Sequence, residues 1–74
     1  MSPLRFAISA VGGQAAAARI CGVSSVAVFK WLKRGSLPRT EYTGKTDYSE
    51  RLASHAQGAF TAEWLKHSAN PDKN

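Results

Sequence analysis

The sequence predicts an all-α domain of four to five short helices, and three observations support this fold class. Apolar residues recur at the three- and four-residue spacing of a helix, most clearly at Val28, Trp31 and Leu32. Serine residues precede several of these segments and glycine residues follow them, as at helix starts and ends. Strand composition occurs at 40–43, which favours at most a short edge strand there.

The 74 residues have room for one modest core, because a small chain buries only a limited share of its surface. We therefore expect a single compact domain over 1–69. The polar tail at 70–74 is expected to be disordered.

The first helix is expected to begin after Ser2, whose hydroxyl can cap it, with Pro3 in the first turn. Its apolar face consists of Leu4, Ala7, Ile8 and Val11. Gly12 and Gly13 follow this face and end the helix.

The second helix is expected over 14–21 and a tight turn follows it. Ala17 and Ala18 are small where the next helix must approach closely. Gly22 follows the helix at a position that favours a left-handed backbone, which glycine adopts without strain from a Cβ atom.

The third helix is expected over 25–33, after Ser24, whose side chain can accept a hydrogen bond from a free backbone N–H. An inward stripe is formed by Val28, Trp31 and Leu32. The opposite face carries Ser25, Val26, Phe29 and Lys30. Two short helices joined in this way make a helix-turn-helix with one face left open.

After the third helix comes a long connection at 36–46, and the sequence does not decide whether it is a wing or only a connector. Asp47 is expected to cap a fourth helix that ends at Gly58. One face of this helix would hold Tyr48, Leu52 and Ala56. Thr61 and the residues after it suggest a final short helix.

Charge is distributed unevenly along the chain, whose net charge is +5. Residues 1–40 contain six basic side chains and no acidic one, whereas residues 41–74 contain four basic and five acidic ones. The half that contains the helix-turn-helix therefore carries +6, which favours a polyanionic partner such as nucleic acid.

The motif resembles the helix-turn-helix of phage repressors, in the lambda-repressor-like DNA-binding family, and more narrowly the small Cro-like and YdaS-like regulators of prophages. The resemblance rests on Gly12, Gly13, Gln14, Ala15, Ala16, Ala17, Ala18, Gly22, Val23, Ser24, Val28, Trp31, Arg34, Gly35 and Pro38. It implies a sequence-specific transcriptional regulator, a Cro-type repressor that binds a short double-stranded DNA operator as a homodimer. Residues 25–33 would lie in the major groove.

The resemblance also implies a set of DNA-binding residues. These are Gln14, Ser24, Ser25, Val26, Phe29, Lys30, Lys33, Arg34 and Arg39. We expect Ser25, Val26 and Lys30 to meet base edges, with a phosphate contact as the alternative for Lys30. Phe29 either contacts the DNA or folds back against the first helix, and the sequence leaves both open.

Phosphate contacts are expected from the residues around the third helix. Gln14 would contact a phosphate and brace the reading helix, and Lys33, Arg34 and Arg39 would clamp the backbone without choosing a sequence. Ser36 is a further candidate donor to a phosphate.

Enzyme, metal and cofactor functions receive no support from the residues. The end of a phosphate-binding loop at 44–46 lacks its glycine, because position 39 is arginine. Cys21, His55 and His67 lack zinc-ligand spacing, and Cys21 falls on an inward position. We therefore expect no cofactor, no metal and no catalytic residue.

The expected location is the cytoplasm of a bacterium, for a bacterial or phage-encoded protein. There is no apolar run long enough for a membrane span, and the apolar segment at 4–11 is too short and amphipathic for a signal peptide. A single cysteine fits a reducing compartment.

Two alternative functions remain open at this stage. One is an antitoxin-like module that masks a toxin or another protein partner through Phe60, Trp64 and Leu65. The other is an architectural or excision factor that bends DNA. Whether Phe60 and Trp64 belong to the core or to an interface is likewise undecided by the sequence.

Overall fold

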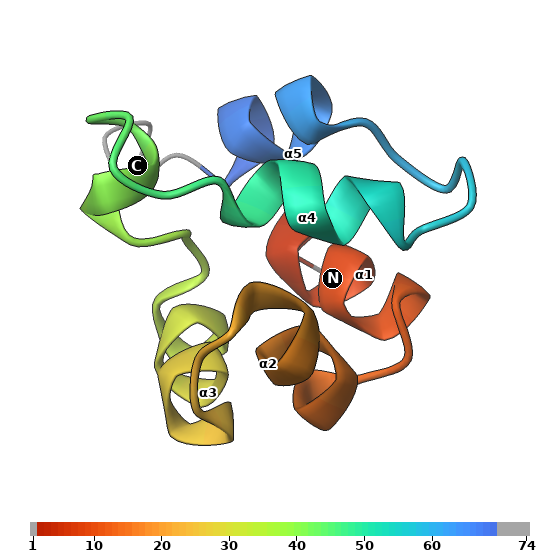
Figure 1. The fold of residues 1–74 in the computed structure, drawn as a ribbon, viewed down its shortest axis with the longest axis horizontal. Coiled ribbons are helices and arrows are strands. Elements are labelled where there is room, and N and C mark those ends of the chain that lie inside the picture. Colours follow the sequence, from red (N-terminus) through yellow and green to blue (C-terminus); the bar gives the residue numbers. More distant parts are fainter. Residues whose placement is uncertain (1, 70–74) are drawn as a thin grey trace.

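The computed structural model describes residues 2–69, and within that range it is all-helical, which confirms the predicted fold class (Figure 1). The elements are α1 (Pro3–Ala10), α2 (Gln14–Cys21), α3 (Ser25–Arg34), a 3₁₀ helix η1 (Arg39–Glu41), α4 (Tyr48–Ser54) and α5 (Ala62–Ser68). The expected disordered tail at 70–74 lies outside the described residues. The single-domain boundary at 1–69 stays a prediction.

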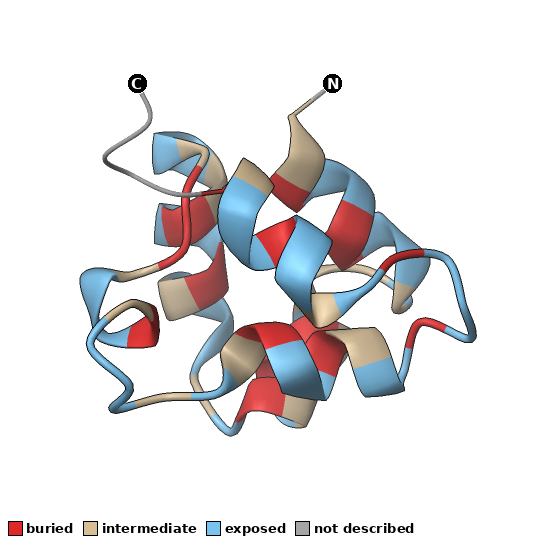
Figure 2. Ribbon diagram, turned by 90° about the horizontal axis from the view of Figure 1, so that it is seen from above, coloured by how far each residue is buried: buried red, intermediate tan, exposed pale blue. Residues whose placement is uncertain are grey.

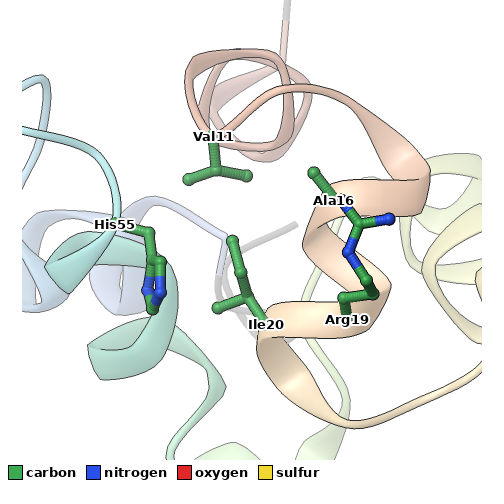
Figure 3. A pocket seen from close by; sticks show the side chains of 5 residues that line it. All are labelled: Val11, Ala16, Arg19, Ile20 and His55. Carbon is green, nitrogen blue, oxygen red and sulfur yellow. The ribbon is translucent and has the colours of Figure 1, made fainter.

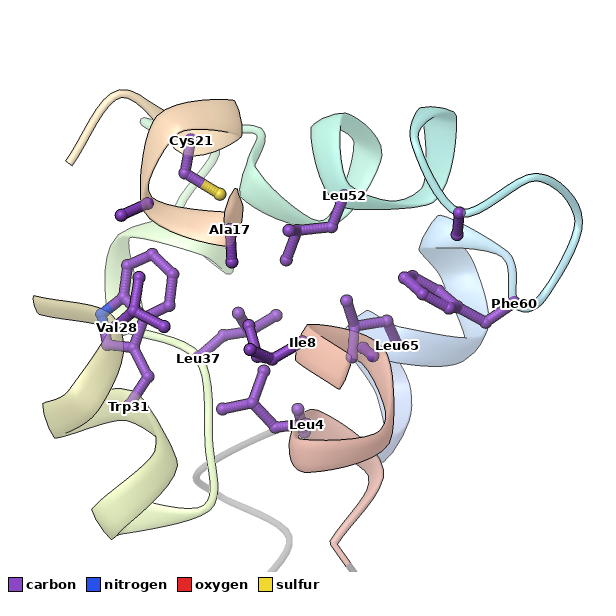
Figure 4. Packing of buried hydrophobic residues seen from close by; sticks show 14 residues of the cluster. Leu4, Ile8, Ala17, Cys21, Val28, Trp31, Leu37, Leu52, Phe60 and Leu65 are labelled. Atoms are coloured by element: carbon purple, nitrogen blue, oxygen red, sulfur yellow. The ribbon is translucent and has the colours of Figure 1, made fainter. Parts of the chain in front are cut away.

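One apolar core joins the five α-helices (Figure 4). Its largest fully buried apolar side chains are Leu4, Val28, Leu37, Leu52 and Leu65, and they come from α1, α3, the segment after α3, α4 and α5. Figure 2 shows the buried parts of the helices turned towards one another, with exposed residues on the outside. Burying each such side chain contributes about 1.5 to 3 kcal/mol, so removal of any helix would expose a share of the same core.

The start of α1 follows the sequence prediction. Ser2 occupies the N-cap position, and its hydroxyl oxygen accepts a hydrogen bond from the backbone N–H of Arg5 at 3.1 Å. Pro3 is the first helical residue, where its lack of an N–H costs nothing. Leu4, Ala7 and Ile8 of this helix are buried, as the helical spacing predicts.

The short strand suggested at 40–43 is not formed. Residues Arg39–Glu41 instead form η1, and the backbone N–H of Tyr42 donates to the carbonyl of Arg39 at 2.9 Å. The carboxylate of Glu41 is drawn inward and is only 2% exposed. This tertiary contact overrides the local strand preference, and no neighbouring strand in the described range offers a ladder to pair with.

The carboxylate of Glu41 caps α4, a role that the sequence assigned to Asp47. Its two oxygens accept hydrogen bonds from the backbone N–H groups of Tyr48 and Ser49, at 2.9 and 2.8 Å. The hydroxyls of Thr46 and Ser49 also donate to it. Asp47 does occupy the N-cap position, but its side chain makes no capping bond and accepts instead from Arg51 Nε at 2.8 Å.

The fourth helix ends earlier than the prediction of Gly58. It ends at Ser54, because the N–H groups of His55 and Ala56 bond to carbonyls three residues back and tighten the chain into turns. Gln57 then adopts a left-handed backbone with φ of 52°, followed by Gly58. The glycine therefore belongs to the loop between α4 and α5 and is not the residue that stops the helix.

No single helix within residues 2–69 is long and apolar enough to cross a membrane, although α2 and α3 together meet the length and composition despite a bend of 112° between them.

Cys21 is expected to be unreactive in the folded protein. Burial raises the pKa of its thiol to about 11 from 9.0; Glu41 and Asp47 add to the rise and Arg51 opposes it. Because the thiolate is the reactive form, alkylation at pH 8 should be slow for the folded chain and fast in denaturant. Equal rates in the two states would contradict this placement.

The same shift makes folding stability depend on pH. Between about pH 9 and 11 the unfolded thiol ionises while the folded thiol does not, so the free energy of unfolding should fall as pH rises through this window. We expect a loss of about 2 kcal/mol relative to the variant Cys21→Ala, measured by urea unfolding at each pH.

Candidate nucleic-acid interface

The helices α2 and α3 form a helix-turn-helix around a three-residue turn. The two helices meet at an angle of 112°, within the range of about 90° to 120° that this motif adopts. Gly22 has a left-handed backbone with φ of 71°, and the N–H of Val23 reaches back to the carbonyl of Ala18 at 3.0 Å. Ser24 then caps α3 by accepting from the N–H of Ala27 at 3.2 Å. The predicted turn is confirmed residue by residue.

The inner side of α3 is fixed to the rest of the molecule. Val28 is fully buried and Trp31 nearly so, whereas Leu32 is half-buried. The ring of Trp31 lies 4.9 Å from the ring of Tyr48, which begins α4. Ala17 of α2 is fully buried as well, and its small side chain lets α2 and α3 pack closely. These contacts hold α3 in one orientation.

The outer side of α3 is exposed over its whole length. Val26 and Phe29 are 59% and 52% exposed, and because they stand three residues apart on one helix they lie on neighbouring turns of the same side. The polar residues of the same side, Ser25, Lys30 and Lys33, are exposed as well. Phe29 is therefore not part of the buried core, and its contact with DNA stays a prediction.

Gln14 connects the starts of the two helices. Its side-chain amide Nε2 donates a hydrogen bond to the backbone carbonyl of Ser25 at 2.9 Å. The bond joins the first residue of α2 to the first residue of α3. A hollow of about 400 Å³ lies beside it. The hollow is lined by Arg5, Ile8, Ser9, Gly13, Gln14 and Leu32.

Cationic side chains follow the exposed side of α3, and the first forty residues of the sequence contain no acidic side chain. Lys33 and Arg34 are exposed in the last turn, where positive charge also suits the helix dipole. Arg39 is exposed at the start of η1. The first acidic residue of the chain, Glu41, is buried under α4, so its charge does not face this surface.

Ser36 is not a surface residue, contrary to the expectation that it could meet a phosphate. It is 3% exposed, and its N–H bonds to the carbonyl of Trp31 at 3.2 Å. After Gly35, whose φ is 77°, the chain turns inward to bury Leu37. The turn that ends α3 therefore takes Ser36 away from the solvent.

Sequence reasoning missed a second hollow, of about 410 Å³ (Figure 3). Arg19 of α2 and His55 at the end of α4 approach it from opposite sides, over an apolar floor that includes Ile20. None of its lining residues belongs to α3, so this hollow is separate from the exposed side of α3. Arg19 and His55 lie far apart in the sequence, and no sequence pattern predicted that both would line the same hollow.

Most residues of the expected DNA-binding set lie on α3 or at its start and are exposed or half-buried. We call these residues and Gln14 the α3 surface, which consists of Gln14, Ser24, Ser25, Val26, Phe29, Lys30, Lys33 and Arg34. Arg39 lies after the end of α3, in η1. The surface combines hydroxyl, apolar and cationic groups on a rigid helix, which is the chemistry that reads base edges and phosphates.

The chain is similar to the 8.4 kDa Cro protein of Escherichia phage HK022, with 45% identity over 49 residues. The similarity covers 66% of this chain and 64% of the length of that relative. No protein-family model and no solved structure matches the chain. The similarity to a phage Cro protein confirms the resemblance to small Cro-like regulators that the helix-turn-helix residues predict.

Proposed function

We propose that this chain is a sequence-specific DNA-binding regulator of the Cro type, which inserts α3 into the major groove of a short operator. The observation that carries the proposal is the α3 surface, where two large apolar side chains stay exposed among serines and lysines. A soluble helix gains nothing from exposing Val26 and Phe29 to water. Against a base edge and a thymine methyl group, both side chains find apolar partners.

Base reading falls to the first turns of α3. Ser25 can donate or accept a hydrogen bond, and Val26 offers a methyl surface for thymine. Lys30 lies one turn further on the same exposed side, where its ammonium group can reach the O6 and N7 atoms of guanine. The Gln14 bond to Ser25 holds this end of α3 in place before DNA arrives.

The residues around these base-contacting side chains would bind the DNA phosphates. Lys33 and Arg34 continue the exposed cationic side of α3, and Arg39 follows in η1. Such contacts release counterions and set the affinity and register of the complex, but they are the same for every sequence. Gln14 is placed at the edge of the same surface and can donate its second amide hydrogen to a phosphate.

The regulator would act as a homodimer in the bacterial cytoplasm. Two copies on a near-palindromic operator place one α3 in each half-site. A bound dimer would repress by excluding RNA polymerase from an overlapping promoter. This function needs no catalytic residue and no cofactor.

The direct test is selection of bound DNA from a random duplex pool, followed by titration of the enriched site at several salt concentrations. Enrichment of a short near-palindrome, bound at least about a thousandfold more tightly than random DNA, is the expected result. Uniform binding that depends only on salt, with no enriched sequence, would refute sequence-specific recognition.

Lys33 gives a separate prediction about phosphate contacts. The variant Lys33→Ala should weaken binding to operator and to random duplex by the same factor, and should lower the slope of log affinity against log salt by about 1. The matched control is Lys66→Ala, which removes the same charge from the exposed side of α5. An unchanged slope for Lys33→Ala would remove this residue from the phosphate contacts.

A further inference from the structure

Two hollows on the described part of the chain have similar volumes, of about 400 and 410 Å³. The smaller one is lined by Gln14, whose side chain bonds to the start of α3, so it adjoins the α3 surface. The larger one has no role in the function proposed above. We call it the Arg19 hollow, and it is lined by Val11, Ala16, Arg19, Ile20 and His55.

The floor of the Arg19 hollow is apolar and its walls are preformed. Val11, Ala16 and Ile20 are half-buried, and the side chain of Ile20 extends towards Val11 (Figure 3). The turn at Gly12 holds α1 close to α2, because a Cβ atom there would lie only 3.3 Å from the Cβ of Ala16. A volume of about 410 Å³ falls within the range of about 300 to 1,000 Å³ of small-molecule sites.

Arg19 supplies the hollow with a permanent positive charge. Its side chain is exposed, and within residues 2–69 its guanidinium group makes no ion pair and no hydrogen bond. An arginine stays protonated at every physiological pH, and its planar group binds a carboxylate through two parallel hydrogen bonds. No acidic residue lines the hollow, so this cation has no counterion of its own there.

His55 closes the hollow on the side opposite Arg19 (Figure 3). Its Nδ1 lies 3.0 Å from the backbone carbonyl oxygen of Arg51. A carbonyl oxygen only accepts hydrogen bonds, so Nδ1 carries a hydrogen and donates it. This bond fixes the imidazole ring at the end of α4, where the ring forms a wall for whatever occupies the hollow.

We propose that the Arg19 hollow binds a small amphipathic carboxylic acid, with its carboxylate on Arg19 and its hydrocarbon part over Ile20 and Val11 towards His55. The charge of Arg19 selects an anion, and the apolar floor selects an anion that carries a hydrocarbon chain. An alcohol lacks the first property and a short acid such as acetate lacks the second. The inference is independent of DNA recognition.

The bound acid would connect three elements of the fold. The lining residues lie at the end of α1, on α2 and at the end of α4, and none of them lies on α3. The acid and DNA can therefore bind at the same time. A ligand that binds only the folded chain stabilises it, so octanoate at ten times its dissociation constant should raise the melting temperature by at least about 5 °C.

Titration of the ¹⁵N-labelled chain with octanoate tests the site. The expected result is saturable binding with a dissociation constant of about 1 mM or tighter, as suits a ligand of ten non-hydrogen atoms. The largest amide shifts should occur at Val11, Ala16, Arg19, Ile20 and His55. Acetate and 1-octanol, titrated separately, should each bind at least about fivefold more weakly.

Substitutions of Arg19 separate the ion pair from the apolar contact. Arg19→Gln should weaken octanoate binding at least about fivefold and leave 1-octanol binding unchanged, whereas Arg19→Lys should retain most of the affinity for octanoate. The matched control is Arg5→Gln, which removes the same charge from the lining of the other hollow and should change neither. Equal octanoate binding by the natural chain and by Arg19→Gln would overturn the proposal.

The chain also offers a competing apolar surface. Phe6 and Trp64 are 41% and 40% exposed, and their ring centroids lie 5.9 Å apart, over Phe60, which is almost fully buried. None of these rings lines the Arg19 hollow. Octanoate shifts concentrated at Phe6 and Trp64, or no saturation up to about 10 mM, would overturn the site.

DNA binding by Arg19→Gln distinguishes this site from a further phosphate contact. The variant should bind the operator and random duplex as tightly as the natural chain does, with the same dependence on salt. A salt slope lowered by about 1 would assign Arg19 to a DNA phosphate and overturn the carboxylate site, while the DNA-binding proposal stands. If octanoate binds as described and no DNA sequence is selected, the carboxylate site is retained and the DNA-binding proposal fails.

Discussion

Replacing Glu41 by alanine is expected to lower the free energy of unfolding by about 3 to 5 kcal/mol. Its buried carboxylate accepts from the N–H groups of Tyr48 and Ser49 and from the hydroxyls of Thr46 and Ser49. Alanine leaves these donors without a partner and opens space under α4. Domains of this size have about 4 to 11 kcal/mol in total, so much of the stability is at stake.

Urea unfolding followed by circular dichroism measures the effect of Glu41→Ala, and the melting temperature should fall by at least about 12 °C. The matched control is Glu50→Ala, which removes an exposed carboxylate from the first turn of the same helix. That change costs at most about 1 kcal/mol through the helix dipole. Equal small losses in the two variants would show that the Glu41 cap is not what holds α4.

Replacing Lys30 by alanine is expected to lower operator affinity by about 1 to 3 kcal/mol, or roughly 5- to 150-fold. The side chain is exposed on α3, so its loss leaves the core and the Gln14 bond to Ser25 intact. Because a base contact discriminates between sequences, affinity for random duplex should fall much less than affinity for the operator. Fluorescence anisotropy with both duplexes at one salt concentration measures the two losses.

Lys66→Ala serves as the charge-matched control for Lys30→Ala, since α5 packs against α1 and α4 and carries Lys66 on an exposed position. It should change the affinities for operator and random DNA little, and by equal factors. Equal losses on the two duplexes for Lys30→Ala would assign this lysine to a phosphate and leave base reading to Ser25 and Val26.

Local signals in the sequence were sufficient to place most helices. Ser2 and Ser24 cap the helices they were expected to cap, because an N-cap depends only on residues within one turn. Gly22 adopts the left-handed backbone that its position indicates. The predicted end of the third helix at residue 33 differs from the observed end at Arg34 by a single residue.

Non-local contacts account for what the sequence did not predict about the fold. The cap of α4 comes from Glu41, seven residues before Tyr48, and no local rule connects them. The same contact explains why 40–43 is helical and turned instead of extended. Gly58 looked like a helix stop because glycine often ends helices, but here it serves a loop that begins at His55.

For the candidate site too, local patterns in the sequence predicted some features, whereas features that depend on distant contacts were not predicted. Helical periodicity alone predicted that Ser25, Val26, Phe29 and Lys30 share an outer face. It gave no warning that Ser36 is buried, because that depends on the turn after α3 and on the burial of Leu37. Nor did it point to Phe6, whose contact with Trp64 joins the two ends of the chain.

The most direct test of DNA recognition by the α3 surface is a titration of the ¹⁵N-labelled chain with a duplex that carries one half-site of the selected operator. A single half-site avoids changes caused by dimer formation. The account predicts that the largest amide shifts occur at 24–34 and at Gln14, with α5 nearly unchanged. Shifts concentrated in α4 and α5, with α3 unaffected, would contradict it.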